Sequence, residues 1–168
     1  MAQEEARTAV AEAYRAHYRR LVAAVYAATG DFAGAQDAVQ EAYAAAMDRP
    51  ARFAALEDPQ AWLRVVALNA ARQRWRRRQV FDRLVRLGRV PKDPEPAPPL
   101  TGDRIDLMRA LQSLPRPTRE AIVLHHLFDL TVEQVADELG APVGTIKARL
   151  TRGRARLADV LQPDPAHR

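Results

Sequence analysis

Arginine is concentrated in two segments of the chain, and this is the strongest chemical signal in the sequence. Residues 72–89 include eight arginines and one acid, Asp82, and Trp75 lies among the arginines. Residues 145–156 include five basic residues and no acid. Guanidinium groups bind phosphate and guanine through paired hydrogen bonds, and an aromatic ring can stack on an unpaired base. The pattern therefore predicts two separate surfaces for a polyanion, with nucleic acid as the candidate.

The formal net charge of +5 conceals this segregation, because the rest of the chain is net acidic. Arginine outnumbers lysine by 24 to 2, which favours planar, bidentate contacts over simple point charge. For either segment alone, a solvated helix face explains the charge about as well as a binding surface. The presence of both segments favours binding.

Residues 131–156 have the pattern of two short helices separated by a turn. Thr131 and Gln134 have the spacing of a capping box, Gly140 suits a sharp turn, and Ile146 and Leu150 can anchor the second helix. This is the outline of a helix-turn-helix, whose second helix enters the DNA major groove. An ordinary helical hairpin with a basic rim is the alternative, but turn, capping box and charge together favour DNA binding. The candidate DNA contacts are Thr145, Lys147, Arg149, Thr151, Arg152 and Arg154.

Two further clusters lie in the N-terminal half. Asp37, Gln40 and Glu41 have spacings of three and four, so they share one side of a predicted helix, opposite a stripe of alanines. Alone, such a patch is more often a solvated face than an interface. Another predicted helix begins with apolar residues and continues into the arginine run. Arginines interleaved with an aromatic residue are typical of proteins that bind single-stranded nucleic acid. Trp62, in the apolar part of this helix, is interpreted as a core residue. Its candidate nucleic-acid contacts are Asn69, Arg72, Arg74, Trp75, Arg76 and Arg77.

The elements that must position these residues are all predicted to be helices. Gly30 can end a first helix and Asp31 can cap a second, while Asp58 followed by Pro59 can open a third. No strand-like alternation interrupts the helical spacing of apolar residues. The predicted buried stripes are Val10, Tyr14, Leu21, Val25 and Ala28 in the first helix, Ala35, Ala38, Val39, Ala42 and Ala46 in the second, and Leu107, Ala110, Leu111 and Leu114 in the second half.

Proline divides the chain into two parts. Five of the 12 prolines fall within residues 91–99, which predicts an extended linker. We therefore expect an all-α protein with two small helical domains, and each alone has a core that gives only marginal stability. The expected boundaries are 1–89 for the first domain, 90–102 for the linker, 103–161 for the second domain and 162–168 for a tail.

Several classes of function are not favoured by the sequence. The absence of cysteine excludes disulfides, thiol nucleophiles and thiolate metal sites. His17, His125, His126 and His167 have no metal-ligand spacing, and no glycine-rich phosphate loop is present, so no enzyme activity and no cofactor are predicted. No apolar run is long enough to span a membrane, and the residues near the start are acidic where a signal peptide would be basic and then apolar. A cytoplasmic protein without membrane insertion is therefore expected.

Taken together, these segments resemble bacterial RNA polymerase sigma factors of the extracytoplasmic-function (ECF) type, in the sigma-70 family. Residues 14–30 resemble the opening helix of conserved region 2, residues 35–41 the segment that binds the polymerase clamp, and residues 61–78 the helix that recognises and melts the minus-10 element. Residues 111–115 and 119–124, followed by the helix-turn-helix, resemble region 4, which reads the minus-35 element. Gln36 and Gln73 stand where the family often has an acid.

The resemblance implies that the chain binds core RNA polymerase at its clamp and flap and directs promoter recognition, DNA melting and transcription initiation. Asp37, Gln40 and Glu41 would bind the clamp. Residues 49–60 would form a loop near an extruded base. The arginine run would hold the melted non-template strand, and the second helix of the helix-turn-helix would read duplex DNA. A separate anti-sigma factor is the family expectation, although no residue identifies one.

One alternative remains open, namely a stand-alone helix-turn-helix regulator whose N-terminal half senses a ligand or dimerises. Such a regulator would bind duplex DNA by itself as a dimer, whereas a sigma factor would bind promoters well only together with polymerase.

Overall fold

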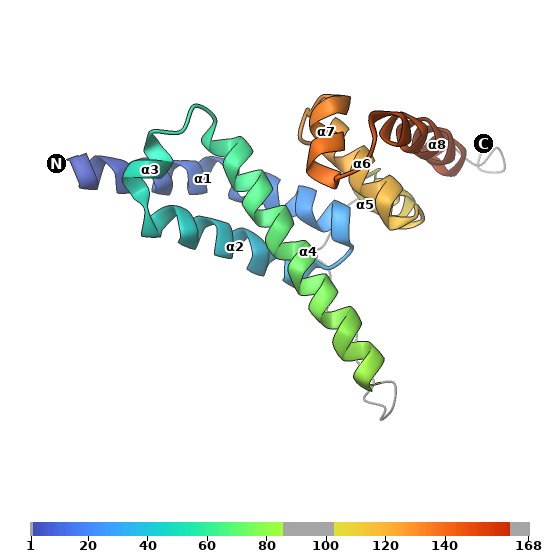
Figure 1. The fold of residues 1–168 in the computed structure, drawn as a ribbon, viewed down its shortest axis with the longest axis horizontal. Coiled ribbons are helices and arrows are strands. Elements are labelled where there is room, and N and C mark those ends of the chain that lie inside the picture. Colours follow the sequence, from blue (N-terminus) through green and yellow to red (C-terminus); the bar gives the residue numbers. More distant parts are fainter. Residues whose placement is uncertain (1, 86–102, 162–168) are drawn as a thin grey trace. The chain divides into compact units, whose positions relative to one another are not determined.

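The computed structural model describes residues 2–85 and 103–161, and within these ranges it contains eight helices and no strand (Figure 1). The all-α prediction is therefore confirmed. The predicted linker at 90–102 and the tail at 162–168 lie outside the described residues. The helices are α1 (Ala2–Thr29), α2 (Phe32–Asp48), α3 (Pro50–Ala54), α4 (Pro59–Val85), α5 (Asp103–Gln112), α6 (Arg116–His126), α7 (Val132–Leu139) and α8 (Val143–Leu161).

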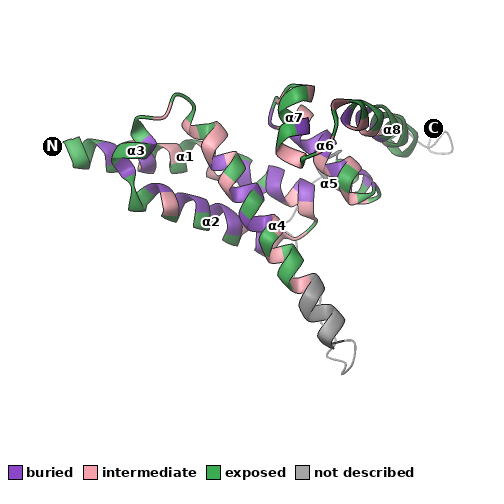
Figure 2. Cartoon of the chain, viewed as in Figure 1, coloured by how far each residue is buried: buried purple, intermediate pink, exposed green. Residues whose placement is uncertain are grey.

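The helices form two compact units. One unit contains α2, α3, α4 and α1 as far as Tyr26, and the other contains α5 to α8 together with Ala27–Gly30. Each unit buries apolar residues of its own helices (Figure 2).

The boundaries of the helices in the first unit follow the predicted signals. Gly30 has a φ of +75°, a left-handed conformation that suits glycine, and α1 ends just before it. The Asp31 carboxylate caps α2 by accepting a hydrogen bond from the Gly34 amide at 3.0 Å. Asp58 caps α4 in the same way, because its Oδ1 accepts from the Ala61 amide at 2.8 Å. These three sequence signals are confirmed.

Small residues let α2 and α4 pack closely. Ala35, Ala38 and Ala42 on α2 are fully buried, and Ala67 on α4 is also fully buried. Small side chains at a contact allow two helix axes to approach. Figure 1 shows α4 crossing α2 and extending past it. The close crossing brings polar side chains at the edge of the contact within reach of the neighbouring helix.

Three features of the fold differ from the predictions. Tyr14 and Leu107 were expected in buried stripes, but they are 41% and 40% exposed, because these helices are covered on narrower faces than the stripes imply. The third difference is α3, a short helix within a segment that was expected to be a loop. Its first residue is Pro50, whose fixed φ suits a helix start.

The exposed ring of Tyr14 belongs to a cluster of tyrosines. Its centroid lies 4.6 Å from that of Tyr18 and 5.0 Å from that of Tyr43. Burial, and after it the neighbouring Tyr14, raises the pKa of Tyr43 to about 12. The Tyr43 hydroxyl therefore stays protonated and donates to the Ala13 carbonyl oxygen at 3.1 Å, which ties α2 to α1.

The second unit contains the predicted helix-turn-helix. Thr131 and Gln134 form a complete capping box at the start of α7, and Gly140 ends that helix with a φ of +59°. Ile146 and Leu150 are buried, as expected for the anchors of α8. The helix-turn-helix prediction is confirmed.

Gly153 marks the closest approach of α8 to α6. A Cβ at this position would lie 2.8 Å from Cγ1 of Ile122 and 2.9 Å from Cγ2 of Thr118. We expect Gly153→Ala to lower the free energy of unfolding by about 1 kcal/mol, because overpacking costs roughly 1–3 kcal/mol and alanine returns up to about 1 kcal/mol of helix propensity. Urea denaturation followed by circular dichroism measures the change.

Gly144→Ala is the matched control, because Gly144 lies in the same helix and nothing is within 4 Å of the added Cβ. Its free energy of unfolding should stay equal or rise slightly. A loss of the same size in both variants would contradict the close packing at Gly153.

Candidate nucleic-acid interface

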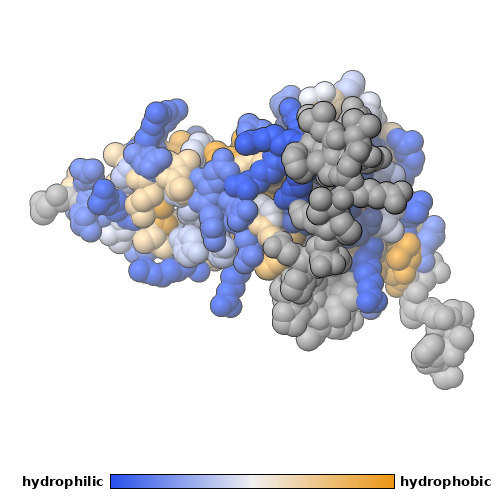
Figure 3. Space-filling model, turned by 90° about the horizontal axis from the view of Figure 1, so that it is seen from below, coloured by the Kyte–Doolittle hydropathy of each residue, from blue (hydrophilic) through white to orange (hydrophobic). Residues whose placement is uncertain are grey.

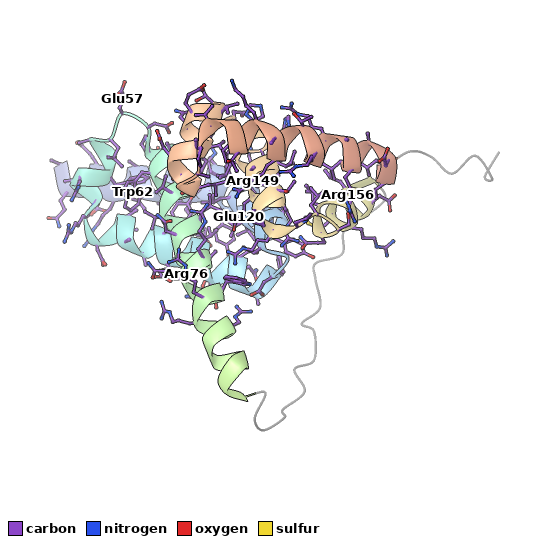
Figure 4. The ribbon with its side chains drawn as sticks, turned by 45° about the vertical axis from the view of Figure 1, so that its right-hand side comes forward. Glu57, Trp62, Arg76, Glu120, Arg149 and Arg156 are labelled. Carbon is purple, nitrogen blue, oxygen red and sulfur yellow. The ribbon has the colours of Figure 1, made fainter. Side chains whose placement is uncertain are left out.

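The exposed face of α8 is fixed by its buried residues. Ile146 is fully buried and Leu150 is 2% exposed, and between them Lys147 and Ala148 point away from the core. Among the predicted contacts, Lys147, Thr151, Arg152 and Arg154 are exposed, whereas Thr145 and Arg149 are half-buried. Figure 4 shows Arg149 and Arg156 along this helix.

Several polar side chains on α8 are already held in place. The Thr151 hydroxyl donates to the Lys147 carbonyl oxygen at 3.0 Å, and the Arg154 Nε donates to Nε2 of His126 on α6 at 3.2 Å. Accepting that bond requires a neutral imidazole. Burial, and after it the neighbouring His125 and Arg154, lowers the pKa of His126, which favours the neutral ring. The Arg154 guanidinium is therefore positioned before any ligand arrives.

The arginine run on α4 has two sides. Arg74 and Arg78 follow the buried alanines of α4 by helical spacing and reach α2. The Arg74 Nη1 lies 3.1 Å from Oδ2 of Asp37, and its Nη2 lies 3.1 Å from Oε2 of Glu41. Arg78 forms an ion pair with Asp31, the residue that caps α2.

The other side of the run points outward. Asn69, Trp75, Arg76 and Arg77 are exposed, and Trp75 keeps 43% of its surface accessible. Figure 4 shows Arg76 on this part of α4. Arg72 is half-buried. An exposed ring between exposed guanidinium groups can stack on a base while the cations contact phosphate. Of the six predicted α4 contacts, the structure therefore turns Arg74 toward α2 and leaves most of the others at the surface.

The polar patch on α2 is accessible. Asp37, Gln40 and Glu41 are all exposed, whereas Ala38 and Val39 between them are buried. The surface formed by Asp37, Gln40 and Glu41 is called the α2 acidic surface below. On the face of the molecule seen in Figure 3, hydrophilic side chains surround smaller apolar patches.

A cavity of about 360 Å³ lies next to α3. Its lining includes Arg49, Arg52, Phe53 and Trp62. The Trp62 ring meets Phe53 edge to face, with centroids 5.9 Å apart. Trp62 was expected in the core, but it is half-buried and its ring contributes to this cavity. The sequence does not reveal the cavity, because residues of α2, α3 and α4 form it jointly.

Two further findings concern the described part of the chain. Among residues 2–78 and 106–161, whose side chains the structure describes, no three His, Asp or Glu side chains come together in a way that could hold a metal ion. In the same ranges, no helix combines the length and the apolar character that crossing a membrane requires.

Known proteins resemble this chain in both of its halves. Residues 13–80 match the family described as Sigma-70 region 2, and residues 104–157 match the family described as Sigma-70, region 4. The RNA polymerase sigma-E factor of Streptomyces coelicolor is 34% identical over 131 residues, which are 76% of this chain and 71% of that protein. The ECF RNA polymerase sigma factor SigE of Mycolicibacterium smegmatis is 32% identical over 162 residues, which are 89% of this chain and 60% of that protein.

A solved structure is also similar. It is the sigma factor RpoE from Bartonella quintana in complex with the anti-sigma factor NepR. The match has a TM-score of 0.67 and 28% sequence identity, and it covers 86% of this chain and 91% of that one.

The chain therefore belongs to the sigma-70 family of bacterial RNA polymerase sigma factors. Within that family it is a sigma factor of the ECF type, a protein that binds core RNA polymerase and promoter DNA and directs transcription initiation. The stand-alone regulator is not favoured, because the N-terminal half matches region 2.

Proposed function

We propose that the two parts of the chain divide the work of initiation. Residues 1–89 would bind the polymerase clamp and recognise and melt the minus-10 element, while residues 103–161 would read the minus-35 element and meet the flap. The linker at 90–102 would span the two, and residues 162–168 would be a tail. The matches to region 2 and region 4 support this division.

The α2 acidic surface is the proposed clamp contact. Its two carboxylates and one amide are exposed on a single helix, which suits a basic partner helix. Charges of this kind steer the encounter and select the partner, and charge pairs that become desolvated in the complex also contribute to affinity.

The outer side of α4 is the proposed contact to the melted non-template strand. Asn69, Arg72, Trp75, Arg76 and Arg77 combine hydrogen-bonding, stacking and cationic groups on one helix. Arg74 is assigned to the same strand, although in the structure it contacts α2. Extruding a base from the duplex costs roughly a few kcal/mol, and binding of the extruded base by the protein can offset that cost. Melting would thus be driven by binding, with no catalysis by the chain and no cofactor.

The cavity beside α3 is the proposed binding site for one extruded base. Phe53 and Trp62 offer aromatic surface, and Arg49 and Arg52 offer donors for phosphate. This assignment agrees with the expectation that residues 49–60 lie near such a base.

The proposed partners are core polymerase, duplex promoter DNA and its melted non-template strand, and the proposed place of action is the cytoplasm, where polymerase works. A separate anti-sigma factor is a further proposed partner. The similar structure from Bartonella quintana, a sigma factor bound by an anti-sigma factor, supports it.

One observation carries the proposal, namely the basic surface of α8, where Lys147 and Arg152 are exposed and Arg149 is half-buried beside the core residues Ile146 and Leu150. We expect Arg149→Ala to reduce transcription about tenfold at a promoter selected from random DNA with the holoenzyme, since one bidentate arginine contact to a base contributes about 1–3 kcal/mol. Run-off transcription measures the loss.

Arg156→Ala is the matched control, because it removes the same charge from the same helix outside the predicted contacts. It should keep most of the activity. An Arg149→Ala loss that is equal on the selected promoter and on one with a scrambled minus-35 element would make Arg149 a phosphate contact without base recognition.

A further inference from the structure

Arg74 connects the α2 acidic surface, which is proposed to bind polymerase, with the arginine run of α4, which is proposed to bind the melted strand. From α4, its guanidinium bridges Asp37 and Glu41 on α2, with both nitrogen-to-oxygen distances at 3.1 Å. The two carboxylates lie one helical turn apart, and a planar guanidinium presents two parallel donors that fit such a pair. Arg74 therefore pairs with two acids that are proposed to bind polymerase, and it belongs to the arginine run that is proposed to bind DNA.

Exposure indicates which side of this bridge a partner reaches first. The side chains of Asp37 and Glu41 are 57% and 53% accessible, whereas that of Arg74 is 34% accessible. The Nε of Arg74 is buried and has no hydrogen-bond partner among the described residues. A basic partner can thus approach the carboxylates while the guanidinium lies behind them and is incompletely satisfied.

Two other ion pairs of α4 differ from that of Arg74 in the role of their acids. Arg78 pairs with Asp31 and Arg64 pairs with Asp58, and both of these acids cap the start of a helix. Those acids are held in place by their capping bonds, so they are not available to a new partner. The acids that Arg74 contacts are in the middle of α2 and cap nothing, so their partner can change while the fold stays intact.

We propose that Arg74 is an exchangeable counter-ion that links polymerase binding to DNA binding. In the free chain, Arg74 neutralises Asp37 and Glu41. When the basic surface of the clamp takes over these carboxylates, the guanidinium is released toward the phosphates of the melted strand. This inference rests on the proposed function of the α2 acidic surface.

The exchange has a reciprocal consequence. If polymerase binding raises the affinity for the melted strand through Arg74, the strand raises the affinity for polymerase by the same factor. Exposed ion pairs contribute little individually, so the expected factor is about threefold to tenfold. The free chain is accordingly a weaker binder of single strands than its arginine content suggests.

The test is the affinity of Arg74→Gln for bacterial core RNA polymerase, measured by fluorescence anisotropy with the labelled full chain. Removing Arg74 exposes both carboxylates to the clamp, so we expect binding to tighten about threefold to tenfold and to depend more steeply on salt. With polymerase bound, the same variant should bind the non-template minus-10 strand more weakly than wild type. A variant that gains affinity for one partner and loses it for the other is not explained by misfolding.

Arg64→Gln is the matched control, since it removes an ion-paired arginine from the same helix at a distance from the α2 acidic surface. Its affinity for polymerase should equal that of wild type. Unchanged or weaker polymerase binding by Arg74→Gln, or an equal gain in Arg64→Gln, would overturn the exchange.

A second variant separates the inference from the function on which it rests. If Asp37→Ala with Gln40→Ala loses polymerase binding while Arg74→Gln leaves it unchanged, only the exchange is wrong. If the double variant binds as wild type does, the clamp assignment fails and the exchange fails with it.

Discussion

The double variant Asp37→Ala with Gln40→Ala should bind core RNA polymerase at least about 30-fold more weakly than wild type, since truncating one member of a desolvated charge pair costs roughly 2–5 kcal/mol. Both side chains are exposed on α2 while their neighbours Ala38 and Val39 are buried, so the substitutions remove contacts without opening the core. Fluorescence anisotropy at two salt concentrations measures the affinity, and circular dichroism checks the fold.

Glu12→Ala is the control for this variant, because Glu12 is an exposed acid on α1 outside the α2 acidic surface. Its affinity for polymerase should be close to that of wild type. Equal affinities of the double variant and wild type, with both folded, would remove the clamp assignment and direct attention to another face of region 2.

The second large effect is expected on promoter opening. Arg76→Ala with Arg77→Ala removes two exposed cations beside Trp75 on the outer side of α4. Losing two such contacts should raise the temperature needed for opening and lower the open fraction at least about tenfold, since each specific contact to nucleic acid contributes roughly 1–3 kcal/mol. Permanganate footprinting of the melted thymines over a temperature series measures this.

Arg7→Ala with Arg19→Ala matches the loss of charge on the exposed side of α1 and should leave the footprint unchanged. Binding of polymerase by the α4 variant should also stay near the wild-type level, because its substitutions do not touch the α2 acidic surface. A permanganate pattern identical to wild type would show that Arg76 and Arg77 do not stabilise the melted strand.

Much of the fold could be predicted because its signals are local. Gly30, Asp31, Asp58 and the capping box at Thr131 each act through a hydrogen bond or a backbone angle within a few residues. Helical periodicity gave the anchors of α8 for the same reason. By contrast, the exposure of Tyr14 depends on how much of α1 its neighbours cover, which periodicity does not determine.

The candidate site was harder to predict where it depends on contacts between helices. Composition marks Arg74 as one of many arginines, yet its register with Ala67 and Ala70 directs it to α2. Combining the arginine run with the buried face of the helix would have separated Arg74 from Arg76. The cavity lined by Phe53 and Trp62 had no such signal, since it requires three helices to meet.

Under the proposed exchange of Arg74, the buried alanines between α2 and α4 influence regulation as well as packing. Ala38 and Ala42 touch neither of the proposed partners, yet the distance they allow between the helices decides whether Arg74 can span to Asp37 and Glu41. A single added methylene at such a site shifts well-packed helices or strains their side chains. Natural variation at these alanines would therefore tune how strictly promoter opening waits for polymerase, without altering any residue that contacts polymerase or DNA.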